Sequence, residues 1–218
     1  MAWLHDRALT LVMLGLFMVS LFGQVLTGWH EHNNDLLDHG HAAIALSGYF
    51  ATGHLWEAIF ENWESEFLQM GAFVVLTAFL VQKGSPESRR PRVAEPFDAD
   101  PRRFRDHPGA PWPVRRGGWV LRLYEQSLGL AFLLLFLMCW IGHALGGFAE
   151  FRSEALAHRQ ASPAFTDYLS SSRFWFESFQ NWQSEFLAIG AMVWLSVYLR
   201  QRGSPESKAV HASHADHD

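Results

Sequence analysis

One polar hexapeptide occurs twice in the sequence, as NWESEF at residues 62–67 and as NWQSEF at residues 181–186. Residues at i, i+3 and i+4 share one face of an α-helix, so each copy places an Asn, a Ser and a Glu side by side. Such a face can hydrogen-bond to a neighbouring helix, or its carboxylate can bind a proton or a cation. The residues considered as this site are Asn62, Trp63, Ser65, Glu66, Asn181, Trp182, Ser184 and Glu185.

Glu66 and Glu185 separate three interpretations of this motif. Each precedes an apolar run, and an ionisable side chain at membrane depth usually faces the interior of a helix bundle. We therefore expect each Glu to lie on an inward face with the Asn and Ser of its copy. There it would either strengthen helix packing, through hydrogen bonds worth about 1 kcal/mol each, or form a proton or cation site with the other Glu. The third interpretation is interfacial solvation without a specific role.

A second candidate site is the His-rich segment WHEHNNDLLDHGH at residues 29–41. Imidazole and carboxylate groups together suit a transition metal, so a divalent metal is the one cofactor that the sequence suggests. Residues 148–160, which lie 119 positions further on, retain only Glu150, Glu154 and His158 of these groups. That loss favours the alternative, a solvated, pH-sensitive loop with no cofactor. The candidate ligands are His30, His32, His39 and His41.

The pentapeptide GSPES is a third candidate, because it follows two of the apolar segments, at residues 84–88 and 203–207. Glycine favours the left-handed conformation that ends a helix, and the following Ser-Pro prevents the helix from continuing. The Glu and the final Ser are kept in both copies although a helix end does not need them. We therefore expect a cytoplasmic contact between the copies or with a partner. The residues are Gly84, Ser85, Pro86, Glu87, Ser88, Gly203, Ser204, Pro205, Glu206 and Ser207.

These motifs belong to a tandem duplication, because the offset of 119 holds without a gap from residues 4–88 to residues 123–207. Of these 85 aligned positions, 34 are identical. Each copy is therefore expected to form the same supersecondary unit. In the second copy Gly142 and Gly146 form a GxxxG pattern, which predicts close packing of the first and third apolar helices.

Apolar residues make up 49% of the chain and cluster in four blocks. A bilayer core of about 30 Å requires about 20 such residues per helix. The sequence predicts an all-α, polytopic membrane protein whose four transmembrane helices form two parallel tandem-repeat helical hairpins. A cleaved signal peptide is the alternative for the first block, but an internal copy of that block argues against it. The predicted spans are about residues 8–29, 64–83, 124–147 and 183–202, with the fourth helix running from Arg173 to Arg202 after a cap within Ser170–Ser172.

Lys and Arg concentrate between the second and third spans. Residues 83–122 hold ten of them, residues 30–65 none and residues 150–184 three. Short cytoplasmic loops carry an excess of positive charge, so we expect both termini to be cytoplasmic. Two spans per copy would then make the copies parallel, related by an axis along the membrane normal.

The sequence divides into four segments. Residues 4–88 and 123–207 are the two repeats, residues 89–122 are a basic, Pro-rich cytoplasmic linker without helical periodicity, and residues 208–218 are a His-rich disordered tail. The linker either enforces topology or binds anionic lipid headgroups. Acidic residues interrupt its positive charges and the net charge is −5, which argues against nucleic acid as a partner.

The segment at residues 168–208, YLSSSRFWFESFQNWQSEFLAIGAMVWLSVYLRQRGSPESK, resembles the C-terminal half of a group of uncharacterised bacterial membrane proteins, defined as a domain of unknown function. The resemblance rests on the pattern W-x-S-E-F followed by L-R-Q-[RK]-G-S-P-E-S. The first copy differs from the second in having Val81 for Arg200 and Lys83 for Arg202. The resemblance implies a multi-pass protein of the bacterial cytoplasmic (inner) membrane and no particular activity.

No Walker loop, GxSxG elbow, CxxC pair or dinucleotide fingerprint is present, so we expect no enzyme. A non-enzymatic accessory, scaffold or envelope-stress component of the membrane is the favoured function. The alternative is a small proton or cation transporter or channel that uses Glu66 and Glu185. The expected partners are the lipid bilayer and either further copies, as a homo-oligomer, or a larger membrane complex.

Overall fold

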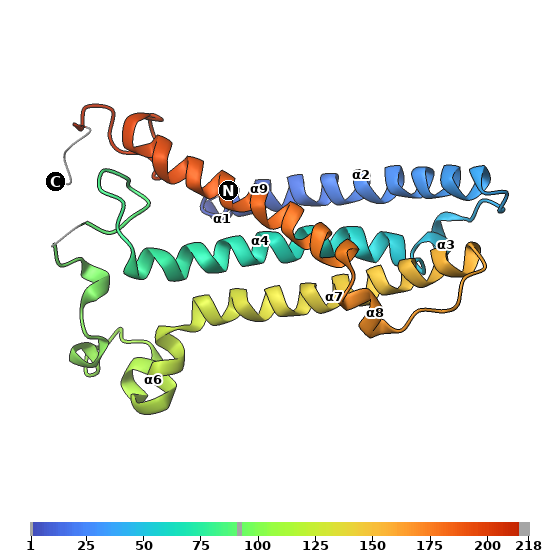
Figure 1. Ribbon diagram of the computed structural model, residues 1–218. Coiled ribbons are helices and arrows are strands. Elements are labelled where there is room, and N and C mark those ends of the chain that lie inside the picture. Colours follow the sequence, from blue (N-terminus) through green and yellow to red (C-terminus); the bar gives the residue numbers. More distant parts are fainter. Residues whose placement is uncertain (1, 91–92, 214–218) are drawn as a thin grey trace. The chain divides into compact units, whose positions relative to one another are not determined.

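The computed structural model describes residues 2–90 and 93–213, and within them the chain is all-helical, which confirms the predicted class. The last residues of the predicted tail, 214–218, lie outside the described part. Four long helices form most of the structure: α2 (Ala8–Asp38), α4 (Gly53–Phe79), α7 (Ser127–Ala157) and α9 (Ser172–Tyr198) (Figure 1). The short elements are α1 (Ala2–His5), α3 (Leu46–Tyr49), η1 (Pro96–Asp98), η2 (Pro101–Phe104), α5 (Trp112–Arg116), α6 (Gly118–Glu125) and α8 (Phe165–Leu169).

Two of the long helices, α2 and α7, are apolar enough over their length to cross a membrane. Each has 31 residues, and at about 1.5 Å per residue this is about 46 Å, longer than a hydrocarbon core of about 30 Å. The 27-residue helices α4 and α9 carry the polar hexapeptides in their interior. Within the described residues, α2 and α7 are the two helices with the required apolar stretch.

The bounds of the long helices follow the offset seen in the sequence. Both ends of α2 and α7, and both ends of α4 and α9, differ by 119 positions. The ends of α2 and α7 also close alike: the His39 N–H donates to the Asp35 carbonyl, as the His158 N–H does to that of Glu154. Gly40 follows with φ of 78°, and its counterpart in the second copy takes the same left-handed conformation. This conformation stops a helix because the next N–H can no longer reach the carbonyl four residues earlier.

The observed α9 begins one residue before the predicted start, at Ser172. Its N-terminal cap is Ser171, whose Oγ accepts the N–H of Phe174 at 3.3 Å. At the other end α9 stops at Tyr198, as α4 stops at Phe79, and both ends fall four residues before the predicted ends of the spans. The GSPES segments therefore do not directly terminate these helices.

The chain forms two compact units. Unit 1 consists of Met1–Phe60 and Ile141–Phe174, and unit 2 of Glu61–Trp140 and Trp175–Asp218. Each unit contains parts of both sequence copies, because α4, α7 and α9 each contribute residues to both units. The duplication in sequence is therefore not a division into two separate domains.

In unit 1, α4 and α7 cross at glycine positions. A Cβ on Gly146 would lie 2.6 Å from the backbone nitrogen of Glu57, and a Cβ on Gly53 would lie 2.6 Å from the carbonyl oxygen of Gly146. The GxxxG pattern predicted packing of α7 against α2, and this prediction is wrong. Gly142 and Gly146 both face α4, while Gly23 of α2 has open space where a Cβ would be. The small residues of α7 admit a backbone, and the backbone that approaches is that of α4.

In unit 2 the basic linker contains η1, η2, α5 and α6 instead of an extended connector. Ala110, Val114 and Leu121 form a small buried apolar cluster between these turns. The sequence predicted a linker without helical periodicity, and it did not indicate these short helices. Helices of three to eight residues are too short to produce a periodic apolar pattern, which is why the sequence did not indicate them.

Candidate functional site

The first GSPES segment forms a turn that is separate from α4. The Ser85 N–H donates to the Gln82 carbonyl at 3.2 Å, and Gly84 has φ of 94°. The Ser88 Oγ accepts the Gln82 N–H at 2.7 Å, which satisfies a backbone donor that the ended helix no longer pairs. The predicted role of the glycine as a helix terminator is thus wrong, because its left-handed conformation serves this turn. The second segment has the same hydrogen bonds and glycine conformation at Gln201, Gly203, Ser204 and Ser207.

The polar side chains of the first turn reach the second copy within unit 2. Ser85 Oγ and Ser196 Oγ of α9 lie 2.8 Å apart and are hydrogen-bonded, and both residues are buried. Glu87 forms a side-chain hydrogen bond with Glu206, the residue at its own position in the second turn. Two carboxyl groups can share a hydrogen bond only when one of them carries a proton.

Glu87 titrates near neutral pH in this contact. Burial, followed by the hydrogen bond and negative charge of Glu206, raises the pKa of Glu87 from 4.5 to about 7. The charged form is disfavoured because water is partly excluded and because a second carboxylate lies alongside. One proton is therefore gained or lost at this contact within the physiological pH range.

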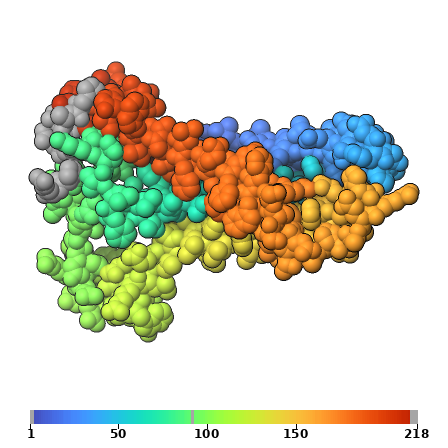
Figure 2. Space-filling model, in the orientation of Figure 1, coloured from blue at the N-terminus to red at the C-terminus, as the bar shows by residue number. Residues whose placement is uncertain are grey.

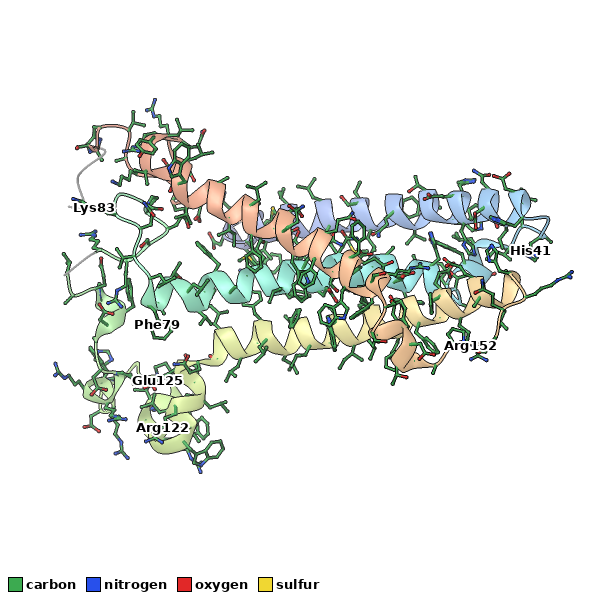
Figure 3. All side chains as sticks on the ribbon, viewed as in Figure 1. His41, Phe79, Lys83, Arg122, Glu125 and Arg152 are labelled. Carbon is green, nitrogen blue, oxygen red and sulfur yellow. The ribbon has the colours of Figure 1, made fainter. Side chains whose placement is uncertain are left out.

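A pocket of about 860 Å³ opens beside the first turn in unit 2. We call it the turn pocket. In Figure 2 the red residues that follow α9 and the green residues that follow α4 lie at the same end of unit 2, and Figure 3 places Lys83 in the loop beyond Phe79, the last residue of α4. Basic, acidic and apolar side chains all line the pocket. Those used below are Val74, Glu87, Arg90, Phe97, Lys208 and His211.

The hexapeptide in α4 is buried at different positions from those expected. Glu64 is fully buried and Ser65 is 2% exposed, whereas Asn62 and Glu66 are exposed. The predicted inward face of Asn62, Ser65 and Glu66 is therefore correct for Ser65 alone. The packed face of α4 contains Glu57, Glu61 and Glu64, which are spaced by four and three residues, and Asn62 and Glu66 lie outside that face.

Within unit 2 the hexapeptides provide hydrogen bonds between α4 and α9. The Asn181 side-chain amide donates to Glu61 Oε1, and the Trp182 indole N–H donates to Glu64 Oε1 at 3.2 Å. The Gln69 amide donates to the backbone carbonyl of Glu185 at 2.9 Å. In contrast, the hydroxyl groups of the two motif serines bond to carbonyls of their own helices, at Asn62 and Asn181. Ser184 is exposed, and Trp63 is partly buried.

Sequence reasoning missed Glu61 and Glu64 as the carboxylates of this contact. Glu57, Glu61 and Glu64 are spaced at i, i+4 and i+7, which places them on one face of α4. This spacing could have identified them. It was overlooked because these residues are not repeated in the second copy, where Phe176, Gln180 and Gln183 stand at the same positions.

Unit 1 contains a second buried polar group around the crossing of α4 and α7. Arg173 lies 2.6 Å from Glu154 and 3.5 Å from Glu57. His143 is fully buried, and its ring nitrogen and a Glu57 carboxylate oxygen lie within 4.8 Å of one another. The partly buried Arg173 guanidinium can thus neutralise carboxylates on two helices.

The four histidines proposed as metal ligands do not converge. His32 lies near His54 and Tyr49, with ring centroids 5.1 Å and 5.6 Å away. His30 contacts Trp29, and Figure 3 shows His41 in the loop beyond α2. Among the described residues, no three potential metal ligands that include any of these histidines lie close together.

His39 and Tyr49 in this part of unit 1 have altered proton affinities. The hydrogen bond to the Asp35 carbonyl, with the Asp35 carboxylate, raises the pKa of His39. Burial, followed by the charges of Glu31 and Glu150, raises the pKa of Tyr49 to about 12. Tyr49 is hydrogen-bonded to His54 Nδ1 at 2.8 Å. The segment is thus pH-sensitive at His39, while Tyr49 remains protonated.

Comparison with known proteins gives a family but no activity. A family model described as Domain of unknown function (DUF6766) matches residues 1–218. Searches of curated proteins and of solved structures found no match.

Proposed function

Because the chain belongs to the DUF6766 family, a domain of unknown function, we propose its role from its own geometry. It is a multi-pass membrane protein with four spans in two parallel tandem-repeat hairpins and cytoplasmic termini, in the bacterial inner membrane. Its role is that of a non-enzymatic accessory or scaffold component. The polar hexapeptides hold its helices together and are not a catalytic site.

The architecture is supported by the helix bounds and by charge. The four long helices repeat at an offset of 119, and each repeat ends in the same hydrogen-bonded turn. Positive charge concentrates in residues 83–122, on the side that short cytoplasmic loops occupy.

The packing role rests on one observation: each hexapeptide donor that reaches the other helix meets a defined acceptor. Asn181 and Trp182 donate to two carboxylates of α4. Hydrogen bonds between membrane helices contribute about 1 kcal/mol each, enough in combination to select one arrangement. An accessory protein of this kind needs a rigid bundle and an exposed apolar surface.

That surface is present on α2. Every residue from 8 to 20 is exposed, including Leu9 at 77% and Val19 at 72%. Either lipid or the helix of another subunit covers such a surface in a membrane. A scaffold role requires that a protein helix lies there.

Site-specific photocrosslinking in native membranes tests this proposal. A photoreactive residue at Val19 should yield a discrete protein adduct, while one at Leu134 of α7, 69% exposed, is the matched control. Adducts with lipid alone from both positions would refute the scaffold role. For topology, His41→Cys should react with an impermeant maleimide on spheroplasts, and His107→Cys should not; the reverse labelling would invert the proposed orientation.

Proton or cation movement is the second candidate, favoured by the complete burial of Glu64. A carboxylate at membrane depth is costly and often marks an ion pathway. From the sequence, this role was expected at Glu66 and Glu185, but Glu66 is exposed. We therefore move the proposed ion-binding carboxylate to Glu64.

Flux through reconstituted protein separates the two candidates. If the chain conducts, Glu64→Gln should abolish proton or cation flux in liposomes, while Glu66→Gln should leave it intact. Flux lost only in a Glu66→Gln/Glu185→Gln double variant would restore the original pair. Absence of flux in the unaltered protein would reject transport, and the packing role would be the remaining candidate.

A further inference from the structure

We propose that the turn pocket binds the headgroup of a phospholipid that carries a primary amine, with the ammonium at Glu87 and the phosphate at Arg90 and Lys208. The proposal rests on the membrane topology given above, which places the pocket at the cytoplasmic lipid boundary. It assigns a ligand to a pocket that the packing role does not use.

The position of the pocket suits a headgroup. It lies at the end of α4, where Val74, Thr77 and Ala78 give way to the polar turn. Its lining combines these apolar side chains and Phe97 with charged groups of both signs. A volume of about 860 Å³ exceeds what a headgroup needs, and falls in the range of about 300–1,000 Å³ found for small-molecule sites.

Glu87 supplies the acceptor for an ammonium group. Its Oε1 is buried and, within the described residues, has no hydrogen-bond partner, while the same carboxyl bonds Glu206. A buried acceptor without a donor is costly. An ammonium in the pocket would supply that donor and the positive charge that the shared proton otherwise provides.

Basic side chains that line the same pocket would bind the phosphate of the headgroup. Arg90 lines the pocket, its Nε lies 3.3 Å from Glu95 Oε1, and its side chain is 45% exposed. Lys208 and His211 line the pocket from the C-terminal segment. Guanidinium and ammonium groups both bind phosphate through charged hydrogen bonds. The mixture of acids and bases favours a zwitterion over a purely anionic ligand.

Binding to the full-length protein in detergent, measured by native mass spectrometry, tests the proposal. Phosphatidylethanolamine should bind about tenfold more tightly than phosphatidylcholine, because a quaternary ammonium cannot donate a hydrogen bond to Glu87. Glu87→Gln should remove this preference. Glu125→Gln is the matched control, since it makes the same substitution at an exposed residue outside the pocket, and it should keep the preference.

Each of the other outcomes overturns the proposal. Equal binding of the two lipids by the unaltered protein would do so, as would a preference that survives Glu87→Gln. Lys208→Gln provides a second variant if Glu87→Gln fails to fold, and it should weaken the binding of both lipids by the same factor. Free phosphoethanolamine binding as tightly as the lipid would assign the pocket to a soluble amine phosphate and reject the lipid. Maleimide labelling, measured separately, shows whether topology has failed instead.

Discussion

Glu87 and Glu206, which hold the same position in two copies of GSPES, are hydrogen-bonded to each other in unit 2. Two carboxyl groups that share a proton make the contact between the two turns dependent on pH. Ser85 and Ser196 lie close to this contact and form a buried bond that does not titrate in this range. The turns thus have one pH-sensitive and one pH-insensitive bond.

Stability should fall between about pH 4.5 and pH 7. Glu87 has its pKa raised to about 7 in the folded protein, so in this interval the folded state binds more protons than the unfolded state. The free energy of unfolding therefore decreases as pH rises, and the change levels off above pH 7. Thermal unfolding of the purified protein at several pH values measures this decrease in stability. Glu87→Gln should flatten the curve in this interval, and an unchanged slope would show that another group is responsible.

Glu64→Ala should be destabilising, whereas Glu66→Ala should not. The first change leaves the Trp182 indole N–H without its buried acceptor, at a cost of about 1–3 kcal/mol. The second removes an exposed side chain, which typically changes stability by less than about 0.5 kcal/mol. The two midpoints of unfolding in one detergent provide the comparison. Equal losses would contradict the burial pattern of α4.

Gly146→Ala should weaken the crossing of α4 and α7. The new Cβ would lie 2.6 Å from the Glu57 backbone nitrogen, and such overpacking costs about 1–3 kcal/mol. Gly190→Ala is the control, because open space surrounds that position in α9; there alanine should stabilise the helix by about 0.4–1 kcal/mol. If the thermal unfolding midpoints of Gly146→Ala and Gly190→Ala change in the same direction by the same amount, the close backbone contact at Gly146 is refuted.

Ser85 and Ser196 should show an interaction energy in a double-mutant cycle. Each Ser→Ala change removes one partner of their 2.8 Å bond, so the double variant should recover about 0.5–1.5 kcal/mol relative to the sum of the single changes. Ser204→Ala with Ser196→Ala is the matched control, since Ser204 is hydrogen-bonded within its own turn to the Glu206 N–H. Strict additivity of Ser85→Ala and Ser196→Ala would show that the bond contributes nothing.

The helices themselves could be predicted well from the sequence. Their apolar runs and the cap near Ser171 gave the class and located α9 to within one residue at its start. The ends were less accurate: both α4 and α9 stop four residues earlier than expected. The hydrogen bond from the Gln82 N–H to Ser88 Oγ depends on a chain reversal that no helical pattern contains.

The burial of the carboxylates could not be derived from the repeat. Duplication drew attention to Glu66 and Glu185, which recur, and away from Glu61 and Glu64, which do not. Which Glu is buried depends on the side of α4 that meets its neighbour. The spacing of the acids indicated a face, but their sequence alone did not say that the face is packed.

By itself, the sequence determined the helical class, the apolar character of α2 and α7, and the recurrence of local hydrogen-bonded turns, because all of these depend on neighbouring residues. Tertiary structure decided which surfaces meet: Gly146 with α4 instead of α2, Glu64 with Trp182, and Glu87 with Glu206. These contacts join residues far apart in the chain. Their selection depends on whether whole faces fit without steric overlap or an unsatisfied polar group, which local pattern does not encode.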